Sequence, residues 1–390
     1  MHPNDETIRI FLASALRNEP DPWPANWDDA ASIEAVGKAA IYHGIAGLLV
    51  ERAAAIGDWP AGMMSRLQDQ ARAQAMWELR HHQLLARLLA AWNAAGVRAL
   101  VMKGTALAYD LYGSPAARSR ADTDLLVPAD QAARAKAILT EQGYAKGVLG
   151  GVNEKFALQQ PWTLALANGG SHSIDLHWQV MNAPSLQDLL TIAECYADAR
   201  PLPRLSPEAM TMDRVRLLIH TCLHRTMHCN TPYVVDGRAF HDSGRLIWSY
   251  DIRLLAEALD EGQWRQFIGL AAAGGVSRVC RDGLQAASAS LGAPIPGHVL
   301  DSLAQASAGD RNSLYFVRSR SLGRAWQDIR AFPGLRPKLR YALARIVPDP
   351  RFVRAKYPGM ANSSLPLLYA RRLLALVRPP RDRELRRPEP

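Results

Sequence analysis

Two aspartates separated by one residue are the part of the sequence best suited to chemistry. Asp122 and Asp124 lead directly into the apolar run 125–127. Side chains two residues apart on a strand point to the same face, so the two carboxylates would lie together. Crowded carboxylates repel unless a cation lies between them, and Mg²⁺ prefers oxygen ligands of this kind. The pair is therefore a candidate metal site, with a solvated strand edge as the alternative for the pair taken alone.

A third acid lies within the stretch Ser-Ile-Asp-Leu-His-Trp at residues 173–178. Alternation places Asp175 and His177 on one face of a strand and the large apolar residues on the other. An acid in such a strand needs a partner. If this strand lies beside that of Asp122 and Asp124, Asp175 completes a cage of three carboxylates. We interpret His177 as a structural histidine in preference to a metal ligand.

Candidate nucleotide-binding residues precede the acids. Lys103-Gly104-Thr105 lies where a short β-prone run gives way to a helix. A glycine there lets backbone N–H groups approach a phosphate, and the helix N-terminus adds favourable partial charge. Arg118 and Arg120, just before the acidic pair, are candidates for stabilising phosphate charge. Turns of this type are common, so the segment alone is a weak signal.

The elements that must position these residues form a small mixed α/β block between helical regions, which is an α+β organisation. We divide the chain into an N-terminal helical region, the α/β core, a second helical region and a basic C-terminal segment: 1–95, 96–182, 183–330 and 331–390. Within the core, the patterns predict strands at 97–102, 122–127, 163–167 and 173–180, and helices at 106–112 and 129–142. Breakers separate helices expected at 207–229, 245–258, 261–274, 277–291 and 311–330.

The positive charge of the chain is concentrated at its end. The net charge is +9, and residues 331–390 hold fourteen Lys and Arg against four Asp and Glu. Such a segment favours an anionic partner, whether nucleic acid, acidic lipid or a phosphate-rich substrate. The alternative is a solvated arginine-rich face with disorder in the last dozen residues. The basic residues of interest flank an apolar pattern that can fold: Arg336, Lys338, Arg340, Arg351, Arg354 and Lys356.

The composition of the chain is typical of a globular protein. With 48% hydrophobic and 21% charged residues, the chain can fill a core, so disorder is not expected. We expect neither a signal peptide nor a transmembrane segment. The four cysteines are scattered without a CxxC pair, and a cytoplasmic location is expected.

A row of histidines offers a different metal. His220, His224 and His228 recur every four residues, with Cys222 and Cys229 nearby. One helix face with this spacing could bind Zn²⁺. A polar stripe in a helical bundle is the more common origin of such a row, and some of these histidines could contact a substrate.

The order of motifs resembles the DNA polymerase β-like nucleotidyltransferase superfamily, and within it a bacterial family of uncharacterised nucleotidyltransferases. The matching stretches are VMKGTALAYDLYGSPAARSRADTDLLV and SIDLHWQV, with softer likeness at LHRTMH, WSYDI, VPDPRFVRAKYP and LYARRLLAL. Thr105 stands where the superfamily has Ser or Gly, and Thr123 stands where an aliphatic residue is commoner. Neither departure removes a carboxylate.

The resemblance implies transfer of a nucleoside monophosphate from an NTP, ATP being one candidate, to an unknown acceptor with release of pyrophosphate. It implies two Mg²⁺ ions, with Mn²⁺ as a possible substitute, held by Asp122, Asp124 and Asp175. Asp175 would also activate the acceptor. A non-catalytic nucleotide-binding or regulatory module is the alternative. On the catalytic assignment, Asp124→Asn should nearly abolish turnover and, by relieving repulsion, slightly stabilise the metal-free protein.

Overall fold

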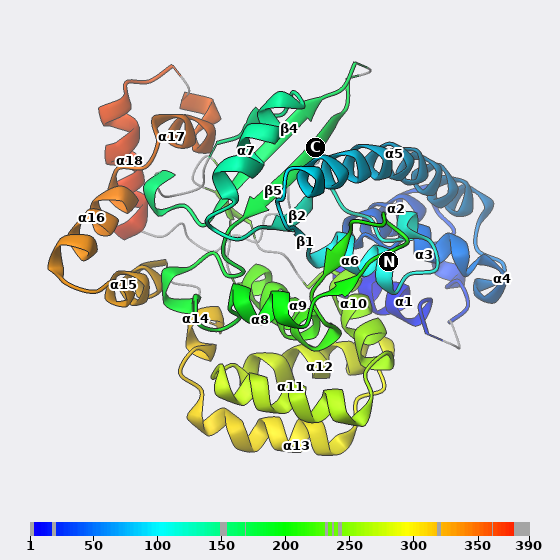
Figure 1. The fold of residues 1–390 in the computed structure, drawn as a ribbon. Coiled ribbons are helices and arrows are strands. Elements are labelled where there is room, and N and C mark those ends of the chain that lie inside the picture. Colours follow the sequence, from blue (N-terminus) through cyan, green and yellow to red (C-terminus); the bar gives the residue numbers. More distant parts are fainter. Residues whose placement is uncertain are drawn as a thin grey trace.

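The computed structural model has an α+β fold in which a mixed sheet lies between N-terminal and C-terminal helices (Figure 1). It describes residues 4–17, 21–148, 154–167, 169–230, 233–235, 238–240, 244–317, 321–360 and 362–377. Asn168, within the expected turn between two core strands, and the end of the basic segment from Arg378 onward lie outside the described residues.

The N-terminal region is helical, as its apolar spacing predicts. Its helices are α1 (Asp5–Ser14), α2 (Ala30–His43), α3 (Ala46–Glu51), α4 (Ala53–Ile56) and α5 (Ala61–Ala94). Phe11 stacks on Trp59 and packs edge-on against Trp23 and Trp27, which anchors α1 to the following turns. Gly96 follows α5 with a φ of +73°, the left-handed conformation that suits glycine after a helix end.

Seven short strands form the main sheet. They are β1 (Leu100–Val101), β2 (Thr123–Leu126), β3 (Ala145–Lys146), β4 (Gln159–Ala165), β5 (Ser171–His177), β6 (Arg200–Pro201) and β7 (Met210–Thr211). Their order is β3-β4-β5-β2-β1-β7-β6. β2 pairs with β5 in parallel and with β1 antiparallel. The sheet recruits β6 and β7 from beyond residue 182, so it extends past the block in which we expected it.

Helices pack on both faces of the sheet because β2 and β5 bury side chains on both sides. α5 covers one face, where its His81 contacts Thr123 of β2 and His172 of β5. The other helices of this part are α6 (Lys103–Asp110), α7 (Ala132–Glu141) and α8 (Ile192–Ala197). Figure 1 shows α9 (Arg214–Asn230) below the sheet, on the side away from α5.

The second helical region follows the predicted breakers closely. It contains α10 (Leu246–Glu257), α11 (Glu261–Ala273), α12 (Ser277–Leu291), α13 (Gly297–Ala306) and α14 (Ser313–Val317). A separate hairpin joins β8 (Tyr233–Val235) to β9 (Arg238–Phe240). α8, α13 and β6–β9 were not predicted, and residues 210–211 of the helix expected at 207–229 form β7 instead. A two-residue strand such as Arg-Pro carries no periodicity to find. Apolar side chains of the N-terminal helices, the sheet and α9–α14 share one core.

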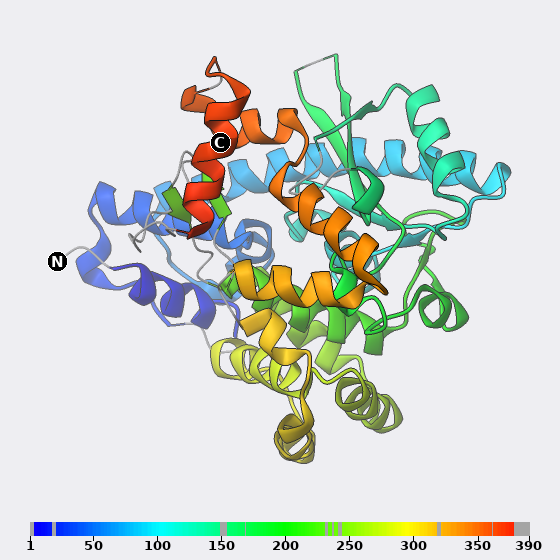
Figure 2. The ribbon, with the colours of Figure 1, turned by 90° about the vertical axis from the view of Figure 1, so that its left-hand side faces the viewer.

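The C-terminal part consists of α15 (Ser321–Ala331), α16 (Leu335–Ile346), α17 (Pro350–Lys356) and α18 (Leu365–Val377). Val353, Tyr357 and Leu368 form a small core of their own, apart from the main one. Figure 2 shows these orange and red helices on the side of the molecule that faces the viewer. Among the described residues, no helix combines the length and apolar character needed to cross a bilayer.

Candidate active site

Asp124 and Asp175 lie side by side because β2 and β5 run parallel in a register that pairs them directly. Paired residues project from the same face of a sheet, and His177 follows on that face two residues later. One ligand atom from each of the three side chains lies within 4.8 Å of the other two. Within the described part of the chain, this is the one group of three His, Cys, Asp or Glu side chains with that geometry.

Asp124 is held as an ionised carboxylate. Lys103 Nζ donates a hydrogen bond to Asp124 Oδ1 at 2.5 Å, and His177 Nε2 donates to the same oxygen at 2.9 Å. Burial raises the pKa of Asp124, but the charge of Lys103 and the hydrogen bond from His177 outweigh burial and lower it below its usual value. Asp124 is therefore the acid of the site that already has a cationic partner.

Asp122 and Asp175 have the opposite electrostatics. Asp122 immediately precedes β2 and lies at the surface, yet the protein packed around its carboxylate removes water. That desolvation and the charges of Asp124 and Asp175 raise the pKa of Asp122 to about 6. Burial and Asp124 also raise the pKa of Asp175. Three carboxylates against the one ammonium of Lys103 leave an excess of negative charge, which favours a divalent cation.

The donor atoms fit a divalent metal ion. Two carboxylates and an imidazole suit borderline metals, whereas a set of carboxylates alone suits Mg²⁺ or Mn²⁺. Asp124 and Asp175 belong to both sets, while His177 and Asp122 distinguish them. His177 is fully buried and hydrogen-bonded to Asp124, so it also fits a role in orienting that carboxylate. A ligand role for Asp122 stays a prediction.

The Lys103-Gly104-Thr105 segment begins α6 directly after β1. Lys103 has a φ of +51° and is the one non-glycine residue with positive φ among those described. Backbone in this region is costly for a residue with a side chain and is found where the surrounding structure imposes it. The conformation accompanies the contact of Lys103 with Asp124. Gly104 lies under Arg118, because a Cβ on Gly104 would stand 2.7 Å from Arg118 Cζ.

The two predicted phosphate-binding arginines are buried in intramolecular ion pairs. Arg118 Nη2 donates to Asp251 Oδ2 of α10 at 2.7 Å, and Asp251 also accepts a hydrogen bond from the Tyr112 hydroxyl. Arg120 Nη2 donates to Glu78 of α5 at 2.7 Å. These pairs fix the turn that leads into the acidic pair. Their contact with a nucleotide stays a prediction.

Thr105 also points into the protein. Its Oγ1 accepts a hydrogen bond from Arg120 Nε at 3.1 Å and lies 3.0 Å from Thr123 Oγ1, and the residue is buried. The hydroxyl that the sequence predicts to contact phosphate thus links α6 to the back of β2. A contact between the Thr105 side chain and a nucleotide would need these bonds to be exchanged.

A buried polar chain supports the sheet behind the acids. Thr123 Oγ1 lies 3.0 Å from His81 Nε2, His81 Nδ1 lies 2.9 Å from His172 Nε2, and His172 Nδ1 lies 2.6 Å from the Tyr144 hydroxyl. Burial lowers the pKa of His81 far below its usual value and that of His172 to about 4. Neutral imidazoles can pass hydrogen bonds across the sheet without adding charge to the site.

Two histidines of the α9 row, His220 and His224, interact electrostatically with Asp124 and Lys103. The row does not form a metal group of its own among the described residues. Burial and the charge of Lys103 lower the pKa of His220 to about 3, so its imidazole is neutral. The His224 and His228 rings lie 4.4 Å apart beside Trp248. Cys222 contacts the opposite helix, since a Cβ on Gly283 of α12 would meet its Sγ at 2.8 Å. The zinc alternative gains no support.

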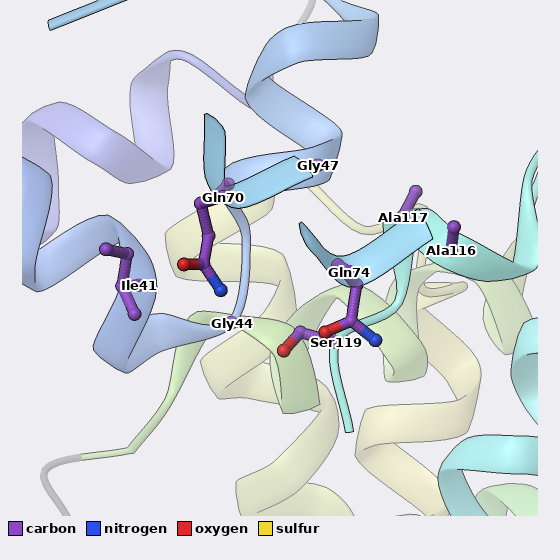
Figure 3. A pocket seen from close by; sticks show the side chains of 9 residues that line it. Ile41, Gly44, Gly47, Gln70, Gln74, Ala116, Ala117 and Ser119 are labelled. Carbon is purple, nitrogen blue, oxygen red and sulfur yellow. The ribbon is translucent and has the colours of Figure 1, made fainter. Parts of the chain in front are cut away.

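The small cavity in Figure 3 has none of the acids in its lining. It is lined by Gln70 and Gln74 of α5, by Ile41 of α2, by Ser119 and by the small residues Gly44, Ala46, Gly47, Ala116 and Ala117. Its volume of about 10 Å³ accommodates one water molecule at most. It is therefore not a nucleotide site.

Comparison with known proteins identifies the family to which the chain belongs. A model of a family described as uncharacterised nucleotidyltransferases matches residues 29–292, a range that includes the sheet, α5, α6 and α9. No curated protein matches the chain. The match spans more than half of the sequence and contains every residue of the candidate site, and the chain belongs to this nucleotidyltransferase family.

Proposed function

We propose that this protein is a Mg²⁺-dependent nucleotidyltransferase that moves a nucleoside monophosphate from an NTP to an acceptor hydroxyl. The observation that carries the proposal is the in-register pair of Asp124 and Asp175, surrounded by excess negative charge, in a chain of a nucleotidyltransferase family. Divalent ions at such a site neutralise the charge that develops on the transferred phosphoryl group. Mn²⁺ could replace Mg²⁺, and we expect two ions.

The three acids have different proposed roles, which follow from their different pKa shifts. Asp124 stays ionised beside Lys103 and serves as a metal ligand. Asp175 has a pKa that is raised, in contrast to that of Asp124, and in this proposal it takes the proton of the acceptor hydroxyl. The acceptor oxygen then forms a bond to the α-phosphorus, the bond from that phosphorus to the bridging oxygen breaks, and pyrophosphate leaves. Asp122 supplies the third carboxylate.

The nucleotide side of the proposal rests on the segment that begins α6. Lys103 contacts Asp124, and Lys103 together with the backbone of Gly104 and Thr105 would face the phosphates, with Arg118 and Arg120 behind them. Lys103 Nζ is the cation best placed to change partner, because a fifth of its side chain is exposed (20%), compared with 9% and 3% for the two arginines. We therefore propose Lys103 as the first phosphate contact.

The test is turnover of each of the four NTPs, labelled on the α-phosphate, with Mg²⁺ or Mn²⁺. Wild-type protein should release pyrophosphate, and Asp175→Asn should lose about a hundredfold or more of that rate if it is both ligand and base. Asp130→Asn is the matched control, because Asp130 is exposed just beyond β2. NTP binding without pyrophosphate release with every acceptor class tried would favour a binding or regulatory module.

We propose a cytoplasmic location, which suits the buried thiols of Cys195, Cys222 and Cys280.

A further inference from the structure

The outer surface of the C-terminal helices is unusually apolar. Of the sixteen large hydrophobic side chains exposed among the described residues, ten lie between residues 321 and 377. On α16 they form a stripe with a spacing of four residues, in which Leu335, Leu339 and Leu343 are 71%, 60% and 61% exposed. Tyr341 and Ala344 bury the opposite side of the same helix against the protein. The apolar stripe is therefore the outward face of α16.

A parallel basic stripe borders the apolar one. Arg336 and Arg340 are exposed on α16, each next in sequence to a leucine of the stripe. On α15, Trp326 is 61% exposed and Arg330 follows it one turn later, also exposed. Residues 331–377 contain nine Lys and Arg and one acidic residue, Asp349. Exposed apolar and cationic side chains thus lie close together on both α15 and α16.

The helices that carry these side chains contact one another. Arg345 of α16 reaches Asp328 of α15 at 3.7 Å, and Arg372 of α18 donates to the backbone carbonyl of Arg345 at 2.9 Å. α18 adds exposed Leu367 and Leu374. Figure 2 shows the orange and red helices together on the side of the molecule toward the viewer. We call the exposed residues of α15, α16 and α18 the C-terminal face.

We propose that the C-terminal face docks on the surface of an anionic lipid bilayer. A bilayer surface is a partner that accepts leucines and a tryptophan at its hydrocarbon boundary while pairing arginines with phosphate groups. Nucleic acid would pair with the arginines but leave the leucines exposed. A second copy of the chain would bring two strongly positive faces together. The thirteen residues after Val377 contain one leucine and five arginines, so they cannot supply apolar cover.

On this proposal, the helices lie flat in the membrane interface and do not span the bilayer. α18 has 13 residues, and α16 has 12, so each is too short to span the roughly 30 Å hydrocarbon layer. An amphipathic surface of this kind lies at the boundary of headgroups and acyl chains, and its affinity depends on both apolar area and anionic charge. Binding should therefore need anionic lipid, weaken with added salt, and persist in part where charge is screened.

The experiment is cosedimentation of the full-length protein with vesicles of phosphatidylcholine alone or of phosphatidylcholine with phosphatidylserine. We expect binding to the anionic vesicles and little to the neutral ones. Arg336→Gln with Arg340→Gln should weaken binding roughly thirtyfold, given the usual attraction of each cation near an anionic surface. Leu339→Gln with Leu343→Gln should weaken it at least as much. All four side chains are exposed or lie on the outward stripe, so far-UV circular dichroism should match wild type.

The matched control is Met76→Gln with Leu79→Gln, which removes two exposed apolar side chains from α5 (65% and 57% exposed). It should bind vesicles like wild type. Equal binding by the Leu339→Gln, Leu343→Gln protein, or no binding to anionic vesicles, overturns the proposal. Tight RNA binding that the same leucine changes leave intact would also overturn it. So would a dimer, detected by sedimentation velocity, that those leucine changes dissociate, in a protein that does not bind vesicles.

Discussion

Replacing Asp124 and replacing Asp122 by asparagine should change the stability of the metal-free protein in opposite directions. Asp124 Oδ1 accepts hydrogen bonds from Lys103 and His177, so Asp124→Asn leaves the Lys103 ammonium short of its partner. Breaking a buried ion pair costs about 3–5 kcal/mol. Lys103 is partly exposed and can turn toward Asp122 and Asp175, so we expect a loss of about 2 kcal/mol.

Asp122→Asn removes a charge that the fold opposes. A rise in pKa from 3.8 to about 6 means that ionised Asp122 destabilises the folded protein at neutral pH. The full shift would correspond to about 3 kcal/mol, but the residue lies at the surface and solvent screens it, so we expect a gain of about 1 kcal/mol. The gain is complete above pH 6 and disappears as the pH falls through 6 toward 3.8.

Urea denaturation in the presence of EDTA measures both effects. Both variants replace one carboxylate oxygen by an NH₂ group, at positions two residues apart, so each is the control for the other. The expectation from sequence alone, that Asp124→Asn stabilises the protein, reverses because Lys103 supplies a partner that the sequence did not reveal. If Asp124→Asn is as stable as wild type, or if both variants shift stability in the same direction, the electrostatic account of the site is refuted.

Three further changes test the neighbours of the acids. Lys103→Met removes a competing cation, so it should tighten Mn²⁺ binding roughly tenfold by calorimetric titration, and unchanged affinity would contradict the pairing. Gly104→Ala places a Cβ 2.7 Å from Arg118 Cζ and should cost about 1–3 kcal/mol in urea, whereas Gly113→Ala, with open space around it, should not. Asp251→Asn leaves the Arg118 guanidinium buried without its partner and should cost about 3–5 kcal/mol, while Glu257→Gln on the exposed end of α10 should change stability by less than about 0.5 kcal/mol.

The sequence predicted the elements of the core well because their patterns are local. The strand around Asp175 alternates apolar and polar residues, that of Asp124 runs into an apolar stretch, and the helices end near glycine or proline. The structure confirms an α+β fold in which these two acids are adjacent. Their proximity depends on the pairing of the two strands, and nothing in either segment specifies its neighbour.

The partners of the site could not be predicted, because each comes from a distant helix. Glu78 and Asp251 look like ordinary polar residues of amphipathic helices, and only the fold brings them to Arg120 and Arg118. The same holds for His81 beneath Thr123. His177 was recognisable by its spacing from Asp175, but the choice between ligand and support depends on which carboxylates lie opposite.

The parallel pairing of β2 with β5 has a consequence for how the protein folds. Asp124 and Asp175 come from strands roughly fifty residues apart, and a parallel contact of that separation forms late because its loop must close first. We therefore expect the cation site to be absent from a partly folded chain. Metal ions would stabilise the finished fold without speeding its formation, so unfolding should slow on adding Mn²⁺ while refolding keeps its rate.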